Sequence, residues 1–325
     1  MLLKTLKGRN FILLVFVPVL IILLWVQSFL NPISLTGTQT QMPLYHLLQS
    51  IAGGSNIVLN IFGVILLILM AFGMVRLNER FIFIQQRTDL PAFIFAFLAT
   101  GTLALKGMHP ALMASFLLFL AIERLFGLYH GSTSVAKSFD AGLLVGLASM
   151  FYLFAGIYLI WIWLSLAVLG YFRGREILAG LLGFITPLFF VVCWYFWHDG
   201  LTDLFINLNK LYSAKNHLQQ YSMYQYAFWG VLTVVVVLSS LYMINVYEEK
   251  KISSRKYFVV LLIFFLCSVA SFLIFRASGI EQYFLSVIPI TYLVSHYFEL
   301  QKHSWMGEVL FAVFIFTGLL IHFLG

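Results

Sequence analysis

The segment Trp194–Trp229, WYFWHDGLTDLFINLNKLYSAKNHLQQYSMYQYAFW, is the longest polar interruption between the hydrophobic blocks of this sequence. From Leu201 onward, apolar residues recur every three or four positions, which is the spacing of an amphipathic helix. The polar face of that helix carries Asp203, Asn207, Lys210 and His217. Aromatic residues gather at both ends of the segment, as they do where helices meet a membrane surface. The pattern predicts an amphipathic helix within residues 198–225 that lies in the membrane–water interface.

The composition of the whole chain requires lipid as the main solvent. Of 325 residues, 62% are apolar and 10% are charged, whereas soluble domains carry about 25% charged residues. The net charge of +7 comes from basic residues in short runs between apolar blocks, a placement typical of orientation charges in membrane proteins and not of a nucleic-acid-binding surface. We therefore expect an all-α, polytopic membrane protein with a single transmembrane domain over residues 1–325.

Eleven stretches are apolar enough to be predicted as transmembrane helices. They are 11–30, 55–75, 91–106, 110–129, 139–154, 156–172, 177–197, 226–246, 257–275, 281–298 and 306–323. The region 139–172 is too long for one span at about 1.5 Å per residue, so we expect a break near Ala155 and Gly156; a single tilted helix there would reduce the count to ten. Pro187 and Pro289 fall within spans and predict kinks.

The distribution of basic residues orients these spans. With the N-terminus in the cytoplasm, fifteen of the nineteen basic residues fall in cytoplasmic segments, which is the bias described by the positive-inside rule. The run EEKKISSRK at 248–256 then lies inside, as orientation charge or as contact with anionic lipid. We expect a bacterial inner-membrane location with a cytoplasmic N-terminus and a periplasmic C-terminus.

A small set of polar residues on the predicted outer side forms the candidate site. Lysine binds phosphate as a point charge and arginine binds it through paired hydrogen bonds. The candidates for phosphate or substrate binding are Lys106, His109, Lys210 and Arg276. A carboxylate whose pKa is raised by burial can serve as general base, and the candidates are Glu281 and Asp203.

Each of these residues also has a purely structural explanation. Charges at helix ends commonly cap the helix, complement its dipole or reach the interface. The outer histidines do not share a helix face at ligand spacing, so we expect no metal ion and no other cofactor. The phosphate-loop, dinucleotide and metalloprotease motifs are absent from the sequence.

Four motifs carry a resemblance to a known family. They are RTDLPAF (87–93), HPALMASFLLFLAIERLF (109–126), FDAGLLVGLASMFY (139–152) and RGREILAGLLGFITPLFF (173–190). In these stretches the chain resembles an uncharacterised family of Bacteroidota inner-membrane proteins. Its architecture is loosely similar to that of multi-span glycosyltransferases and polymerases that use polyprenyl-phosphate-linked sugars. Enzymes of the GT-C type usually carry an acidic residue in the first outer loop, but residues 31–50 contain neither Asp nor Glu.

Three functions are compatible with these observations. The first is a glycosyltransferase-like enzyme or binder for a lipid-linked glycan at the periplasmic face. The second is a non-catalytic membrane subunit or scaffold of a cell-envelope complex. The third is a transporter, which the sequence favours less because repeated halves and mid-membrane charges are not evident. The expected partners are membrane lipids, a polyprenyl-phosphate-linked sugar and envelope proteins, and no nucleic acid.

Overall fold

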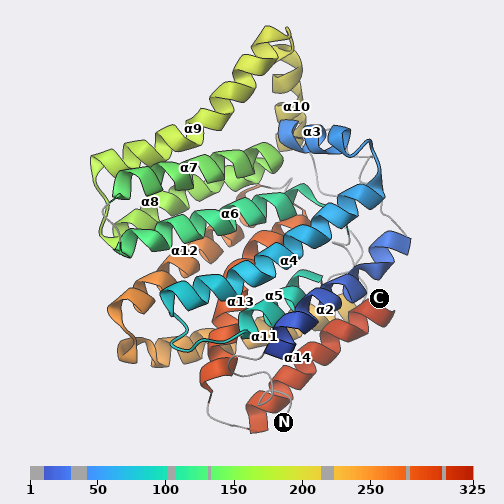
Figure 1. Ribbon diagram of the computed structural model, residues 1–325, viewed down its shortest axis with the longest axis vertical. Coiled ribbons are helices and arrows are strands. Elements are labelled where there is room, and N and C mark those ends of the chain that lie inside the picture. Colours follow the sequence, from blue (N-terminus) through green and yellow to red (C-terminus); the bar gives the residue numbers. More distant parts are fainter. Residues whose placement is uncertain are drawn as a thin grey trace.

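The computed structural model describes residues 11–30, 42–100, 107–130, 133–213, 223–275, 279–301 and 305–324. These residues form thirteen α-helices and several 3-10 turns, without a strand among them (Figure 1). The longer helices are α2 (Phe11–Leu30), α4 (Asn56–Phe81), α5 (Leu90–Thr100), α6 (Pro110–Phe126), α7 (Ser134–Phe151), α8 (Tyr158–Leu169), α9 (Gly174–Trp197), α11 (Met223–Asn245), α12 (Ile252–Ile274), α13 (Tyr283–Leu300) and α14 (Trp305–Leu324). The remaining elements are α3 (Pro43–Ile51), α10 (Leu201–Ser213), η3 (Gly127–His130), η4 (Leu153–Ile157), η5 (Tyr247–Glu249) and η6 (Ile280–Gln282).

Each stretch predicted as a transmembrane helix overlaps one of the longer helices, and the end of the predicted stretch 91–106 lies outside the described residues. Within the described part of the chain, six helices are long and apolar enough to cross a membrane, namely α4, α6, α7, α9, α11 and α12. Shorter apolar helices include α2, α5, α8 and α14. The all-α class and the multi-pass membrane character are therefore confirmed, while the number of eleven spans stays a prediction.

The region 139–172 contains two helices, as the sequence predicts. Tyr152 adopts an extended backbone (φ −138°, ψ 106°) after the end of α7, and the 3-10 turn η4 leads into α8. The two expected intrahelical prolines, Pro187 and Pro289, lie inside α9 and α13. The short helix α3, which begins with Pro43, was not predicted, because its nine residues fall in a stretch read as a loop.

Glycine residues bring α7 and α9 into direct backbone contact. A Cβ atom at Gly142 would overlap the carbonyl oxygen of Gly180, and one at Gly183 would overlap that of Phe139. Gly146 meets the next turn of α9 in the same way. Small residues that let helix backbones approach are the usual means of helix packing in membranes, where apolar burial alone gives little driving force.

At one end of the bundle, which we call the basic end, side chains tie consecutive helices together. Arg80 on α4 pairs with Glu123 on α6 at 2.7 Å, and Arg124 pairs with Asp140 on α7 at 3.6 Å. Further bonds close this end: Lys137 Nζ to Gly127 O at 2.6 Å, Ser134 Oγ to Glu176 Oε1 at 2.8 Å and Thr88 Oγ1 to Glu299 Oε2 at 2.8 Å. The charge distribution predicts that this end faces the cytoplasm.

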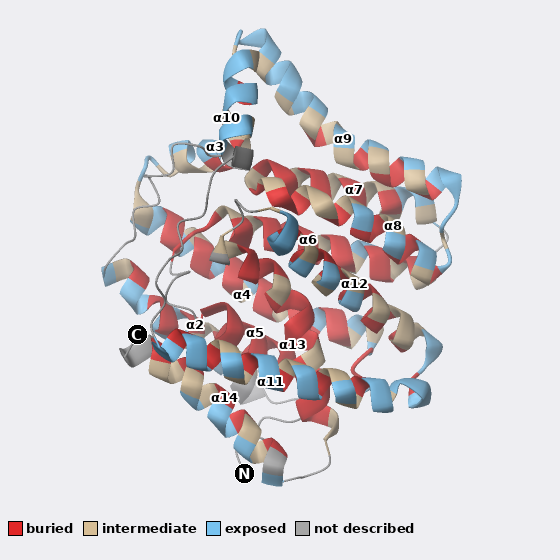
Figure 2. Cartoon of the chain, turned by 180° about the vertical axis from the view of Figure 1, so that it is seen from behind, coloured by how far each residue is buried: buried red, intermediate tan, exposed pale blue. Residues whose placement is uncertain are grey.

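The second half of α9 leaves the bundle and carries α10 with it. In Figure 1 the upper end of α9 projects beyond the other helices, and α10 turns back from it. In α9, Pro187 is the last buried residue, and Trp194, Trp197 and Phe205 are 64%, 84% and 65% exposed. Figure 2 shows this arm mainly in the colours of exposed and intermediate residues, in contrast with the buried centre of the bundle. We call α9 beyond Pro187 together with α10 the arm.

Candidate functional site

Four separate segments meet at the end of the bundle opposite to the basic end. Phe154 in η4 contacts Phe275 at the end of α12, with ring centroids 4.9 Å apart. The start of α6 contacts η6, and the rings of His109 and Phe284 lie 6.4 Å apart. Tyr283 extends the contact to α5 by donating to Leu98 O at 3.3 Å. The connections after α7 and α12 therefore share one site with the beginning of α6.

Polar side chains converge there from the residue that precedes η4 and from α8, α12, η6 and α13. We call the following set the η6 cluster: Tyr152, Tyr158, Ser268, Glu281, Gln282 and Ser286.

Glu281 occupies the 3-10 turn that begins α13. Its carboxylate folds back over Gly279, since a Cβ atom at that glycine would lie 3.0 Å from Glu281 Oε2. The side chain is only partly exposed, and burial raises the pKa of the Glu281 carboxyl above its ordinary value. A carboxylate with a raised pKa is a better proton acceptor than an ordinary surface glutamate, as a general base requires.

Tyr152 brings a buried hydroxyl to this carboxylate. The residue is 5% exposed, and burial together with the nearby Glu281 charge raises the pKa of Tyr152 well above its ordinary value. Its hydroxyl has no hydrogen-bond partner among the described residues, whereas the hydroxyl of the neighbouring Tyr158 interacts with Ser268. Buried polar groups are normally paired, so the unpaired Tyr152 hydroxyl beside this carboxylate indicates a place for a polar ligand or for water.

Gln282 adds a further unpaired atom to the η6 cluster. Its Nε2 donates to Ser268 O at 3.2 Å, which holds the side chain in place, and Ser268 Oγ lies 2.6 Å from Ser286 Oγ. Gln282 Oε1, in a residue that is 2% exposed, has no partner within the described part of the chain. A fixed amide oxygen and the unpaired hydroxyl of Tyr152 are groups that can bind the hydroxyls of a sugar.

His109 stands next to the η6 cluster at the N-cap of α6, followed by Pro110. The residue is 8% exposed, and burial lowers the pKa of its imidazole to about 4. At neutral pH the ring is therefore uncharged, and it can offer a phosphate one N–H donor but no positive charge.

The residues predicted from the sequence fall into three groups. Glu281 and His109 come from distant positions to the same end of the bundle, where the start of α6 meets η6. Asp203 and Lys210 lie exposed on α10, in the arm. Lys106 and Arg276 lie outside the described residues, as does His217 of the predicted polar stripe.

Sequence reasoning missed Tyr152, Tyr158 and Gln282. Tyr152 and Tyr158 flank the expected helix break, and Gln282 follows the predicted base, but an amide or phenol between apolar residues is indistinguishable from a packed side chain without coordinates. The sequence also predicts that Lys250 and Lys251 are orientation charges or lipid contacts. Lys251 is exposed, but Lys250 is buried and only 2% exposed.

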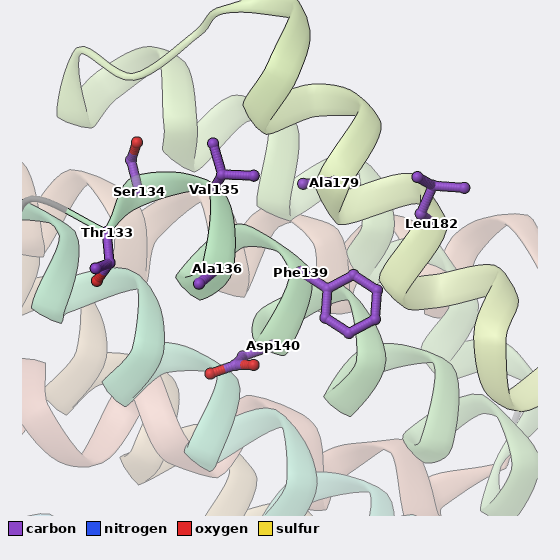
Figure 3. A pocket seen from close by; sticks show the side chains of 8 residues that line it. All are labelled: Thr133, Ser134, Val135, Ala136, Phe139, Asp140, Ala179 and Leu182. Carbon is purple, nitrogen blue, oxygen red and sulfur yellow. The ribbon is translucent and has the colours of Figure 1, made fainter.

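Two pockets among the described residues lie toward the basic end. One, of about 610 Å³, lies beside α7 and α9 and is lined by Ser134, Phe139 and Asp140, among others. Figure 3 shows its polar side chains pointing away from one another, and both Ser134 and Asp140 already bind side chains of neighbouring helices. The other pocket, of about 580 Å³, lies among α11, α12 and α13. The described residues include no cluster of three or more potential metal ligands.

Comparisons with known proteins support the fold and name a family. Residues that cover 95% of this chain superpose on an oligosaccharyltransferase of Archaeoglobus fulgidus, solved in its apo form, with a TM-score of 0.53 and 13% identity. The chain spans 55% of that protein's length, and at this identity the likeness concerns the fold. Among curated proteins there is no match. Residues 1–324 match the model described as "Family of unknown function (DUF6427)", so the chain belongs to this family.

Proposed function

We propose that the protein binds a lipid-linked glycan at the η6 cluster and transfers the glycosyl group to an acceptor hydroxyl. The observation that carries the proposal is the partly buried Glu281 carboxyl, with its raised pKa, beside the unpaired hydroxyl of Tyr152. The likeness in fold to an oligosaccharyltransferase over most of the chain adds support. The membrane location suits a substrate with a long apolar anchor.

The proposed transfer uses Glu281 as general base. Its carboxylate takes the proton of the acceptor hydroxyl while the acceptor oxygen bonds to the anomeric carbon of the donor sugar. The bond from that carbon to the phosphate oxygen breaks, and its electron pair leaves with the phosphate. Lys106 and Arg276, whose neighbours in sequence are Gly107 and Phe275, are proposed to bind this phosphate, and neutral His109 to donate a hydrogen bond to it.

The η6 cluster also explains how the sugar would be held. Tyr152 and Gln282 each offer a fixed polar atom without a protein partner in the described residues. A site built to bind hydroxyl groups rejects analogues that lack them, because its own polar atoms then stay unpaired. We propose that Tyr152 and Gln282 select the sugar, while Asp203 and Lys210 on the exposed α10 meet parts of the substrate or acceptor that extend beyond the site.

A transfer assay with a polyprenyl-phosphate-linked sugar as donor tests the proposal. Glu281→Gln removes the base at nearly constant shape and should lower the transfer rate by about a hundredfold or more. The matched control is Asp199→Asn, because Asp199 is exposed and its φ of 50° is one that asparagine tolerates. Equal rates for Glu281→Gln and the native protein would refute the role of Glu281. Loss of rate in Asp203→Asn alone would move the base to α10.

The arm favours a second candidate, a non-catalytic subunit of a cell-envelope complex. Beyond Pro187, α9 has no buried residue, so large aromatic side chains are available for another membrane protein. Replacing Phe190 and Trp197, which are 65% and 84% exposed, by leucine should release a stable partner after mild solubilisation if this function holds. Native transfer activity in the purified single chain would contradict it.

A further inference from the structure

A second polar site lies buried at the basic end, far from the chemistry proposed above. Lys250 is 2% exposed and its Nζ has no hydrogen-bond partner in the described residues. His296 is fully buried, and neither ring nitrogen has a partner there. An isolated buried charge is costly, and the Lys250 ammonium has no acceptor among the described residues to compensate it.

Both side chains rest against one aromatic ring. The ammonium of Lys250 lies 5.0 Å from the centroid of Phe258, and the imidazole of His296 lies 5.1 Å from the same ring. Lys250 and His296 are close enough to interact electrostatically. Burial lowers the pKa of Lys250 to about 8, so the ammonium keeps its charge at neutral pH.

Phe258 also lines the 580 Å³ pocket among α11, α12 and α13. The wall on the side of α13 is apolar, with Pro289, Ile290 and Leu293. At the η5 end of the pocket lies Glu248, whose residue is exposed and whose carbonyl oxygen accepts a hydrogen bond from Arg255. One ring thus separates an apolar pocket with an acidic rim from two buried donors.

We propose that this pocket and the Lys250–His296 pair form a binding site for phosphatidylethanolamine. An acyl chain would occupy the apolar pocket, whose volume falls in the range of about 300–1,000 Å³ common for ligand sites. The phosphate would accept hydrogen bonds from Lys250 and His296 once Phe258 turns aside. The ammonium of the headgroup would then face Glu248. This charge pattern, donors inside and a carboxylate at the rim, matches a zwitterionic headgroup.

Native mass spectrometry of the full chain in mild detergent tests the site with phosphatidylethanolamine, phosphatidylglycerol and diacylglycerol of the same acyl chains. The native protein should retain phosphatidylethanolamine most strongly and diacylglycerol at least about tenfold more weakly. Lys250→Met should abolish this difference. The control is Lys251→Met, at the exposed neighbour, which should leave it unchanged. Equal binding of the phospholipids and diacylglycerol to the native protein would overturn the proposal, and stronger binding of phosphatidylglycerol would overturn the choice of headgroup.

The pocket and the fold can be tested separately. Ser240→Phe places a ring into the pocket and should reduce phosphatidylethanolamine binding about tenfold, whereas Leu241→Phe, on an exposed position of the same helix, should not. Lys250→Met should raise the melting temperature of the delipidated protein, because it removes an uncompensated buried charge. Added phosphatidylethanolamine should stabilise the native protein and not this variant. Equal stabilisation of both would contradict the assignment of Lys250.

Discussion

The two ends of the bundle differ in how most of their polar side chains are paired, although the basic end also contains unpaired groups, which include Lys250 and His296. At the basic end, ion pairs and side-chain hydrogen bonds join α4 to α6, α6 to α7, and α7 to α9. At the other end, the η6 cluster contains Tyr152 and Gln282, whose polar atoms lack a partner in the described residues. Paired groups stabilise a fold, whereas unpaired buried groups cost stability and are expected where a ligand binds. The polar groups of the basic end therefore serve mainly to stabilise the fold, whereas the proposed chemistry takes place at the η6 cluster.

The largest loss of stability is expected from a substitution that separates α7 from α9. In Gly183→Val, the new side chain would overlap the carbonyl oxygen of Phe139, so about 3 kcal/mol or more of stability should be lost. The control is Gly230→Ala, because a Cβ atom there meets no other group within 4 Å. Thermal unfolding, monitored by size-exclusion chromatography, measures the stability of both variants. A Gly183→Val protein with native stability would contradict the close packing.

A smaller loss is expected from the buried hydrogen bonds of the basic end. Thr88→Val removes the hydroxyl that donates to Glu299 Oε2 and should cost about 2 kcal/mol, as for other hydrogen bonds to charged groups. Thr233→Val serves as the control, since Thr233 is exposed and bonds only to Trp229 O within its own helix. Equal melting temperatures for these two variants would show that the basic end does not depend on this bond.

The η6 cluster should respond in the opposite sense. Tyr152→Phe removes a buried hydroxyl without a described partner, so stability should stay within about 0.5 kcal/mol or rise. The rate of glycosyl transfer should nevertheless fall about tenfold, because the substrate loses a hydrogen bond. Tyr45→Phe is the informative counterpart: its hydroxyl donates to Met108 O at 2.5 Å, so this change should lower stability. A Tyr152→Phe protein that loses stability but keeps its activity would show that the Tyr152 hydroxyl stabilises the fold and does not bind the substrate.

These variants test positions that differ in how far the sequence predicts them. The apolar stretches and the break before Tyr158 follow from span length and hydrophobicity, so the helices could be placed without coordinates. Glu281 and His109 could be selected because polar residues are scarce on the predicted outer side. Their proximity could not be predicted, because it depends on how the start of α6 packs against η6. The burial of Lys250 could not be predicted from the sequence either, because a lysine next to a helix start usually reaches solvent.

The smallest effect concerns pH. The raised pKa of Glu281 means that the folded protein binds this proton more tightly than the unfolded chain. Its contribution to stability is therefore greatest below the ordinary glutamate pKa of about 4.3 and declines as the pH rises through the raised folded-state value. Between the ordinary glutamate pKa and the raised folded-state pKa, Glu281→Gln should become steadily more stable relative to the native protein. Above the folded-state pKa, this difference in stability should stay constant. Thermal unfolding across pH measures the difference, and a gain that shrinks with rising pH would contradict the burial of Glu281.

Photoaffinity labelling with a polyprenyl-phosphate-linked sugar tests the central claim most directly, that the η6 cluster is a ligand site. A photoreactive group on the sugar should label peptides that contain residues 107–112, 152–158 and 279–286, and excess unlabelled donor should suppress the labelling. The variants Tyr152→Phe and Glu281→Gln should reduce it, and Asp199→Asn should not. Labelling confined to the basic end, or spread over lipid-exposed helices without competition, would contradict the account.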